Sequence, residues 1–285
     1  MTGALWAAAS GIGFGLFQSI NRLAVRDMDA YVSTFLQVAV AFVVLCAIAL
    51  ATEDLQPLAH SGAWPLVAFA GAGLVHFLAG WTFLNLSQKR IGAARTSPLL
   101  TVTPVFGLAL AAVAFGELPS AAALLVVAVI FVGAFVVSSS GPAARPSDAR
   151  FGLACALMWA LSPLLTIEGL DGGLSPLLGV TIGMLASVAA YAVFVPTRSL
   201  VRVPRRSLWV KLLAGVLVAF ATWSRWIALD DAEVGVVLAL NLVSVPIVLF
   251  LAPLLSGRAL EVVTMRVWAG AALVVAGSLA LIAVA

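Results

Sequence analysis

Long apolar runs, separated by short polar stretches, follow one another along almost the whole chain. A helix that crosses a bilayer needs about 20 mostly apolar residues, because each residue rises roughly 1.5 Å through a hydrocarbon core of roughly 30 Å. The pattern predicts ten membrane-spanning helices, at residues 4–24, 31–51, 64–86, 92–115, 119–138, 150–170, 175–196, 209–229, 233–254 and 262–284. The runs are continuous rather than alternating, which disfavours strands. The expected fold class is therefore an all-α membrane protein.

The composition supports this prediction. Hydrophobic residues make up 63% of the chain and charged residues 9%, whereas a soluble domain carries about 25% charged residues. The chain is thus solvated mainly by lipid. Its first residues, MTGALWAAASGIG, place no basic group before the apolar run, so we expect the first span to be retained rather than removed as a secretory signal.

Motifs for cofactor chemistry are missing from the sequence. There is no zinc-type spacing, phosphate loop or dinucleotide fingerprint, so we expect no cofactor, no metal and no nucleic-acid partner. Cys46 and Cys155 fall within predicted spans and are expected to be buried free thiols rather than a disulfide or a metal pair. The glycines of GIGFG, residues 11–15, lie inside the first span, where they are expected to allow close helix packing.

Basic residues lie almost entirely on one side of the predicted membrane. If the loops are numbered 1 to 9, the odd loops and their flanks hold every Lys and Arg except Arg225. Most acidic residues belong to the even side: Glu53, Asp54, Glu117, Glu168, Asp171, Asp230, Asp231 and Glu233. Short loops rich in Lys and Arg stay in the cytoplasm, so both chain termini are predicted to lie outside. The run RSLVRVPRRSLWVK, residues 198–211, is interpreted as part of this topological signal.

The second half of the chain repeats the pattern of the first. The matching pairs are Trp81 with Trp223 and Pro104 with Pro246, each 142 residues apart, and Glu117 with Glu261 and Gly133 with Gly277, each 144 apart. Each copy holds five spans, an odd number, so the two copies must enter the membrane from opposite sides, as inverted repeats. The predicted organisation is a first repeat at 1–140, a linker at 141–149 and a second repeat at 150–285.

These motifs resemble those of the drug/metabolite transporter superfamily, specifically the ten-helix type with two EamA domains. The residues that carry the resemblance are Pro98, Pro104, Gly116, Glu117 and Gly133 in the first copy, and Pro246, Glu261, Gly270 and Gly277 in the second. The second copy lacks the Gly-Glu pair, and Val126 replaces the earlier glycine of the first copy. The resemblance implies a transporter of the prokaryotic cytoplasmic membrane, monomeric or homodimeric. The family's substrates include amino acids, other metabolites, drugs and nucleotide sugars.

Polar side chains at depth in the spans are candidates for the site, because lipid penalises them unless they are partnered or functional. The predicted substrate-binding residues are Gln18, Gln37, His76, Trp81, Trp159, Trp223, Trp226, Asn241 and Ser244. His76 is also the candidate for proton coupling, because a free histidine titrates at a pH of roughly 6.5. Each has a structural alternative: a hydrogen bond between helices for the polar groups, and an interfacial position for the tryptophans.

Pro104 and Pro246 are predicted hinges. A proline inside a membrane helix frees a backbone carbonyl and bends the helix. Thr101, Thr103, Asn241 and Ser244 lie close to these prolines. They either form a binding surface with the freed carbonyls or simply satisfy them.

Charge is expected to be scarce in the cavity. Glu168 and Arg225 lie near the ends of their spans and are interpreted as charges that snorkel to the surface or pair there. A strongly anionic substrate calls for Arg or Lys, so a neutral, zwitterionic or amphipathic metabolite is expected.

The leading hypothesis is a secondary active transporter that exports such a metabolite, for instance an amino acid, by alternating access. The cavity between the repeats would be lined by the first, third, fourth, sixth, eighth and ninth spans, with protons as a candidate coupling ion. The alternative is a flippase for a lipid or a lipid carrier. An intramembrane enzyme is disfavoured because no catalytic cluster occurs at depth.

Overall fold

The computed structural model describes residues 2–115, 120–140, 146–195 and 203–284. Helices make up nearly all of these ranges, and no strand occurs within them. Several features of the predicted motifs fall outside the described residues: Gly116, Glu117, Arg145, Arg198, Arg202 and the first part of the linker, residues 141–145.

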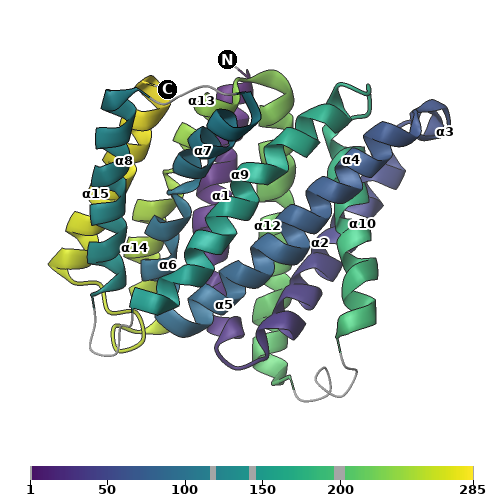
Figure 1. The fold of residues 1–285 in the computed structure, drawn as a ribbon. Coiled ribbons are helices and arrows are strands. Elements are labelled where there is room, and N and C mark those ends of the chain that lie inside the picture. Colours follow the sequence, from purple (N-terminus) through teal and green to yellow (C-terminus); the bar gives the residue numbers. More distant parts are fainter. Residues whose placement is uncertain (1, 116–119, 141–145, 196–202, 285) are drawn as a thin grey trace.

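The helices follow the ten predicted spans (Figure 1). They are α1 (Thr2–Val25), α2 (Ala30–Thr52), α4 (Ala63–Gly73) with η1 (Leu74–Gly80) and α5 (Trp81–Ile91), α6 (Ala93–Leu100) with α7 (Thr103–Phe115), α8 (Ala121–Ser138), α9 (Arg150–Leu170), α10 (Pro176–Phe194), α12 (Arg205–Asp231), α13 (Val234–Asn241) with α14 (Ser244–Ser256), and α15 (Met265–Val284). The short helices α3 (Gln56–His60) and η2 (Pro146–Ala149) lie between spans.

The bundle is that of a multi-pass membrane protein. Within the described ranges, nine helical segments are long and apolar enough to cross a bilayer. The fourth predicted span, which corresponds to α6 and α7, is not among them. Both termini lie at the same end of the bundle (Figure 1), as an even number of spans requires.

The fourth and ninth spans are interrupted at matching places, next to the two predicted hinge prolines. Pro104 and Pro246 are the second and third residues of α7 and α14, the second piece of each span. Because Pro104 has no N–H, the carbonyl of Leu100 loses its helical partner. The Thr103 hydroxyl donates to this carbonyl at 2.6 Å, and the Thr101 hydroxyl donates to the carbonyl of Pro98 at 2.8 Å. The two threonines therefore satisfy the backbone at the break.

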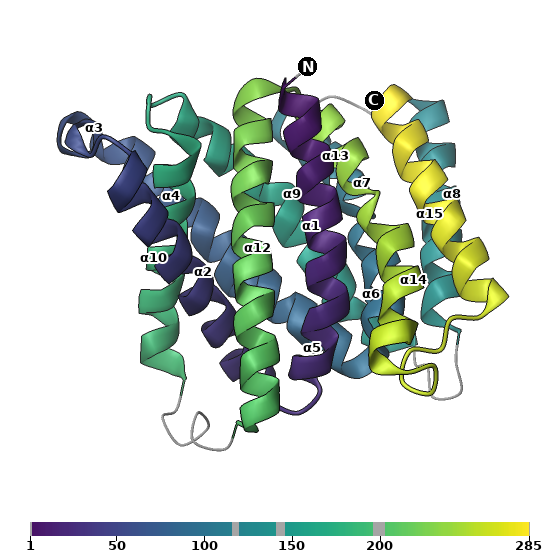
Figure 2. The same ribbon diagram turned by 180° about the vertical axis from the view of Figure 1, so that it is seen from behind.

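Helix pairing supports the predicted repeat. α1 packs on α12, and its counterpart α9 packs on α4, η1 and α5; likewise α2 packs on α12, and α10 packs on α4. α8 pairs with α15 at one edge of the bundle, as the two views show (Figures 1 and 2). If each helix is replaced by its counterpart in the other half, the contacts of α1 and α2 with α12 become those of α9 and α10 with the third span. The contact between α8 and α15 becomes itself. The domain boundaries and the inverted relation stay predictions that this pattern supports.

Glycines set the distance between several helices. A Cβ atom on Gly133 would lie 2.8 Å from the carbonyl oxygen of Gly270, and one on Gly270 would lie 2.9 Å from that of Gly133. These two glycines of the sequence signature therefore bring the α8 and α15 backbones together. In α1, the glycines of GIGFG have the same role: a Cβ on Gly11 would lie 2.7 Å from the carbonyl oxygen of Leu240.

Both cysteines are free, as expected; Cys155 is also buried as expected, whereas Cys46 is only half-buried. Around Cys155 the core is rich in aromatic rings. Trp226 stacks on Phe69 with ring centroids 5.5 Å apart, and Phe77 packs on Trp81 at 4.9 Å. α12 packs against five other helices: α1, α2, α9, α10 and α13.

We predict that Gly11→Ala destabilises the protein, because the new methyl group overlaps the backbone of α13. Overpacking of this kind costs about 1–3 kcal/mol, which should appear as a lower melting temperature of the purified protein in detergent. Gly107→Ala is the control, because a Cβ on Gly107 meets nothing within 4 Å. Equal melting temperatures for the two variants would show that α1 and α13 are not packed as described.

Candidate functional site

A pocket lies near the middle of the spans, where helices from both halves meet. It is lined by Phe14, Gln18, Leu100, Thr101, Thr103, Pro104, Trp159, Arg225, Leu238, Asn241, Leu242 and Ser244. These residues come from the first, fourth, sixth, eighth and ninth spans, which are five of the six predicted to line the cavity. The third span contributes no lining residue. The cavity has a volume of about 40 Å³, which is room for about three waters.

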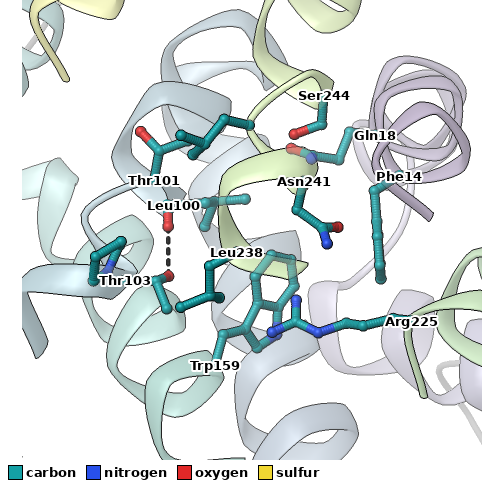
Figure 3. A pocket seen from close by; sticks show the side chains of 12 residues that line it. Phe14, Gln18, Leu100, Thr101, Thr103, Trp159, Arg225, Leu238, Asn241 and Ser244 are labelled. Carbon is teal, nitrogen blue, oxygen red and sulfur yellow. Dashed lines mark hydrogen bonds between the residues drawn. The ribbon is translucent and has the colours of Figure 1, made fainter. Parts of the chain in front are cut away.

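Five predicted residues are thus brought together. Gln18, Trp159, Asn241 and Ser244 surround the pocket with Pro104, and Figure 3 shows Gln18 and Ser244 facing each other beside Asn241. Asn241 is held in place, because its amide donates to the carbonyl of Val237 at 2.7 Å and accepts from the Ser10 hydroxyl at 3.3 Å. Gln18 is different: its Oε1 is buried and has no hydrogen-bond partner among the described residues.

Arg225 is the main departure from the sequence prediction. Rather than snorkelling, its side chain is buried, with 4% of the residue exposed, and it lines the pocket. The described part of the chain places no carboxylate within ion-pair distance of its guanidinium, and Nη2 has no hydrogen-bond partner there. Figure 3 shows the guanidinium pointing toward the indole of Trp159. The expectation of little charge in the cavity is therefore wrong.

The physical reason is that α12 packs against five other helices and Arg225 lies on the buried face of α12, which these helices cover. A sequence signal for this burial exists. Lys211, Ala214, Val218, Ala221 and Arg225 recur at intervals of three and four, which places them on one face of a helix. All five are buried. Small residues on that face predict contact with neighbouring helices, so the two charges that share it must also point inward.

His76 lies directly behind the pocket wall. Its ring stacks on Trp159, with centroids 5.3 Å apart and planes 10° apart. Nδ1 is 2.8 Å from the hydroxyl of Ser162, and Nε2 is buried without a partner among the described residues. His76 belongs to η1, a π-helical turn in which the N–H of Trp81 donates to the carbonyl of His76. Such turns are frequent at functional sites.

The other predicted site residues lie elsewhere. Trp81 and Trp226 are in the aromatic core, and Trp223 is half-buried beside Phe220. Gln37 belongs to a buried polar network on the odd-loop side, where it accepts from the Lys211 ammonium at 2.7 Å. Glu168, at the other end of the bundle, accepts from the indole N–H of the exposed Trp64 at 3.1 Å.

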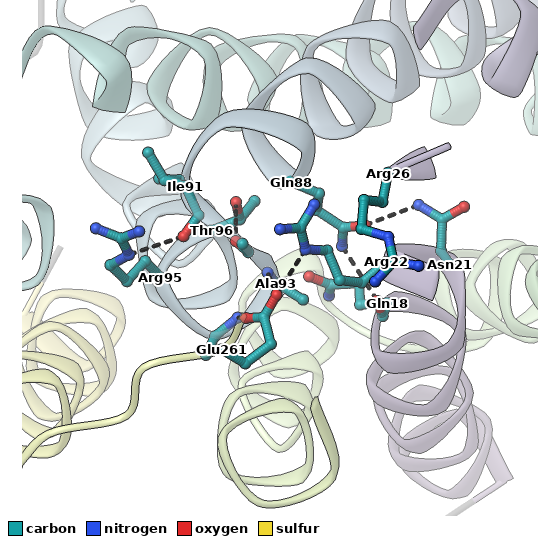
Figure 4. A network of polar contacts seen from close by, with 12 residues as sticks. Gln18, Asn21, Arg22, Arg26, Gln88, Ile91, Ala93, Arg95, Thr96 and Glu261 are labelled. Atoms are coloured by element: carbon teal, nitrogen blue, oxygen red, sulfur yellow. Dashed lines mark hydrogen bonds and ion pairs between the residues drawn. The ribbon is translucent and has the colours of Figure 1, made fainter. Parts of the chain in front are cut away.

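On the odd-loop side, Glu261 joins the last loop to α1 and α6 (Figure 4). Its carboxylate accepts from Arg22 Nε at 2.6 Å and from the backbone N–H groups of Ala93 and Ala94 at 3.2 and 3.0 Å. The two N–H groups begin α6, so a residue of the last loop caps the fourth span. Gly92 is required here: its φ is +85°, and a Cβ would lie 2.6 Å from Glu261 Oε2.

A second contact ties the first loop to α12. Arg26 Nε donates to Asp27 at 2.9 Å, and this hydrogen bond lowers the pKa of the Asp27 carboxyl from its usual value. The ionised carboxylate also accepts from the Ser207 hydroxyl at 3.0 Å. The Asp27 carboxylate therefore joins the end of α1 to the beginning of α12 on this side of the bundle.

Comparison with known proteins defines the class to which this fold and pocket belong. Residues 1–139 match the model of the EamA-like transporter family. One solved crystal structure, 19% identical in sequence, matches with a TM-score of 0.62 over 96% of this chain and 97% of that chain; at this identity it supports the fold alone. No curated protein matches the sequence.

The first half of the chain therefore belongs to the EamA-like transporter family, as the sequence resemblance predicts. The whole chain is a multi-pass integral membrane protein.

We predict that Glu261→Gln lowers the free energy of unfolding by about 3–5 kcal/mol, the usual effect of breaking a buried ion pair. The variant leaves Arg22 buried without its counter-charge, and a scan of melting temperature would detect the loss. Asp148→Asn is the control, because its pair with Arg90 at 3.3 Å is partly exposed and is expected to contribute less than about 1 kcal/mol. A Glu261→Gln protein as stable as the control would contradict the Glu261 contacts described here.

Proposed function

We propose that this protein is a secondary active transporter that exports a small zwitterionic metabolite of the amino-acid type, with a carboxylate and an apolar side chain. The observation that carries the proposal is Arg225, a buried cation that lines the pocket without a described carboxylate partner. Export, a prokaryotic inner membrane and termini outside follow from the resemblance and from the placement of Lys and Arg.

Three residues that line the pocket have a buried polar atom without a described partner: Gln18, Arg225 and, at its indole N–H, Trp159. The first two are complementary to a zwitterion. Arg225 Nη2 is a cationic donor and Gln18 Oε1 is an acceptor. A guanidinium pairs with a carboxylate in a fork of two hydrogen bonds, while an amide oxygen accepts from an ammonium. A buried charge is unfavourable in a membrane unless it is compensated. A bound substrate carboxylate would compensate Arg225.

The walls of the pocket favour a substrate with an apolar part. Phe14 and Trp159 pack on each other with ring centroids 5.8 Å apart, and both line the pocket with Leu100, Leu238 and Leu242. Aromatic faces attract both apolar groups and cations. An aromatic or large aliphatic amino acid fits this surface better than a sugar phosphate, which would need further cations.

Alternating access supplies the mechanism. A pocket of about 40 Å³ is smaller than an amino acid, so the helices around it must separate to admit substrate. The breaks before Pro104 and Pro246 are places where the fourth and ninth spans can bend. Opening to the odd-loop side requires the Arg22–Glu261 contact to break. Two inverted halves of similar structure allow the two open states to have similar energies.

The first test of substrate class is binding and transport by Arg225→Gln. In liposomes loaded with pooled amino acids, we expect wild-type protein to release one class selectively, with L-phenylalanine as the aromatic probe. Arg225→Gln should lose at least about tenfold in affinity for that probe, because truncating one partner of a buried charged contact costs about 2–5 kcal/mol. The shift of melting temperature with ligand concentration measures the affinity.

Arg206→Gln is the matched control, since it removes the same charge from an exposed position of the same helix. Equal affinities of Arg225→Gln and the control would overturn the assignment of Arg225. No release of any amino acid from well-folded wild-type protein would favour the flippase alternative, and a fluorescent-lipid translocation assay would then follow.

Proton coupling through His76 has its own test. His76 touches the pocket wall through Trp159 and has one free ring nitrogen, so we expect a pH gradient to drive wild-type transport and His76→Gln to respond to it much less. The glutamine keeps a group that bonds Ser162. Transport by His76→Gln with an unchanged pH dependence would remove His76 from the coupling mechanism.

A further inference from the structure

A second buried cation lies on the odd-loop side, on the same helix as Arg225. Lys211 is fully buried in α12. Its ammonium donates to Asn21 Oδ1 and, at 2.7 Å, to Gln37 Oε1. Across the described ranges no carboxylate lies within ion-pair distance of it. Its sequence position suggested a topological signal at the membrane surface, yet the side chain does not reach that surface.

The amides around Lys211 leave hydrogen-bond donors in excess. Asn21 Nδ2 donates to Asn85 Oδ1 and to Gln88 Oε1, both at 2.8 Å. Asn85 Nδ2 donates to Gln37 Oε1 at 3.4 Å. The oxygens of all four amides are therefore occupied within the network. Gln37 Nε2, by contrast, is buried without a described partner, and an ammonium has a third N–H. A positive charge with surplus donors is a site for an anion.

A purely structural role explains this arrangement poorly. Burying a lysine in a membrane protein is unfavourable, and apolar side chains of similar volume commonly replace buried charges without loss of stability. The amides could bond one another without an ammonium among them. Structural stability therefore does not explain why a positive charge is buried at residue 211.

The network connects Lys211 to the pocket. Gln88 Nε2 donates to the carbonyl of Gln18 at 3.4 Å, and Gln18 lines the pocket. Lys211 and Arg225 are 14 residues apart, nearly four helical turns, so they share one face of α12 at a separation of roughly 21 Å. Arg225 lines the pocket, and Lys211 donates to Asn21, one of the residues labelled in Figure 4.

We propose that Lys211, with Gln37 Nε2, is a second binding station for the substrate carboxylate, used when the odd-loop side is open. The inference rests on the proposed function, since it assumes that Arg225 holds the same carboxylate in the pocket. Arg225 and Lys211 then lie in opposite halves of the membrane. A substrate carboxylate that leaves one of these cations meets the other. The Arg22–Glu261 contact covers the route to Lys211 until that side opens.

The test places a competing carboxylate inside the station. Gln37→Glu puts a fixed anion next to the Lys211 ammonium. We expect transport of L-phenylalanine to fall at least tenfold in proteoliposomes, while the melting temperature stays equal or rises. The affinity of the pocket, measured by thermal shift, should change less than threefold. A structural lysine would accept the new ion pair with transport intact, and that result would overturn the proposal.

Substitution of the lysine completes the experiment. Lys211→Gln should lower the maximal rate at least tenfold with little change in pocket affinity, Lys211→Arg should restore part of the rate, and Arg206→Gln should behave as wild type. The proposal is wrong if Lys211→Gln transports normally, or if it loses only the response to a pH gradient, which would make Lys211 a proton carrier. The Arg225→Gln variant tests the proposed function separately. If this variant binds L-phenylalanine as wild-type protein does, the assignment of Arg225 to the pocket is wrong, and this inference is wrong with it.

Discussion

Charge buried in a lipid-facing bundle is the constraint on which this structure depends. A medium of low dielectric strengthens every interaction of such a charge and penalises every unmatched one. At Glu261 the match is complete, with one guanidinium and two backbone N–H groups around one carboxylate. At Arg225 and Lys211 the surroundings are neutral amides and aromatic rings. Among the buried charges of the described residues, Arg22 and Glu261 thus satisfy each other, whereas Arg225 and Lys211 have no carboxylate within ion-pair distance.

The same rule shapes the backbone. The break in the fourth span frees carbonyls in the middle of the membrane, and the hydroxyls of Thr101 and Thr103 satisfy them. At the break in the ninth span, the backbone N–H of Val245 donates to the carbonyl of Leu242 at 3.0 Å. Ser278 of α15 even reaches across to the carbonyl of Thr101, at 2.6 Å. At the break in the fourth span, short side chains make the hydrogen bonds that a continuous helical backbone would otherwise make. The fourth span is therefore held in place there without being a rigid helix. The pocket lies beside both breaks, where bending changes its size.

Sequence patterns predicted the spans, the free cysteines, the packing glycines and five pocket residues, because each depends on local polarity or spacing. Gln18, Asn241 and Ser244 could be found since a polar group at depth in a span is conspicuous. Arg225 and Lys211 were missed, because a charge near a span end resembles one that snorkels. The signal that could have placed them is the helix face that they share with Ala214, Val218 and Ala221, which α12 turns toward its neighbours. The cap that Glu261 forms on α6 joins residues that are more than 160 positions apart in the sequence, so no local pattern predicts it.

The capping of α6 by Glu261 also bears on how the protein is made. Ribosomes deliver α1 and α6 to the membrane long before the loop between α14 and α15. During that interval Arg22 and the first N–H groups of α6 have no carboxylate from this loop. Closure of the odd-loop side is consequently among the last events of biogenesis, and the first half cannot finish its own assembly. A nascent chain released before residue 261 would present an open, polar seam that membrane quality control can recognise.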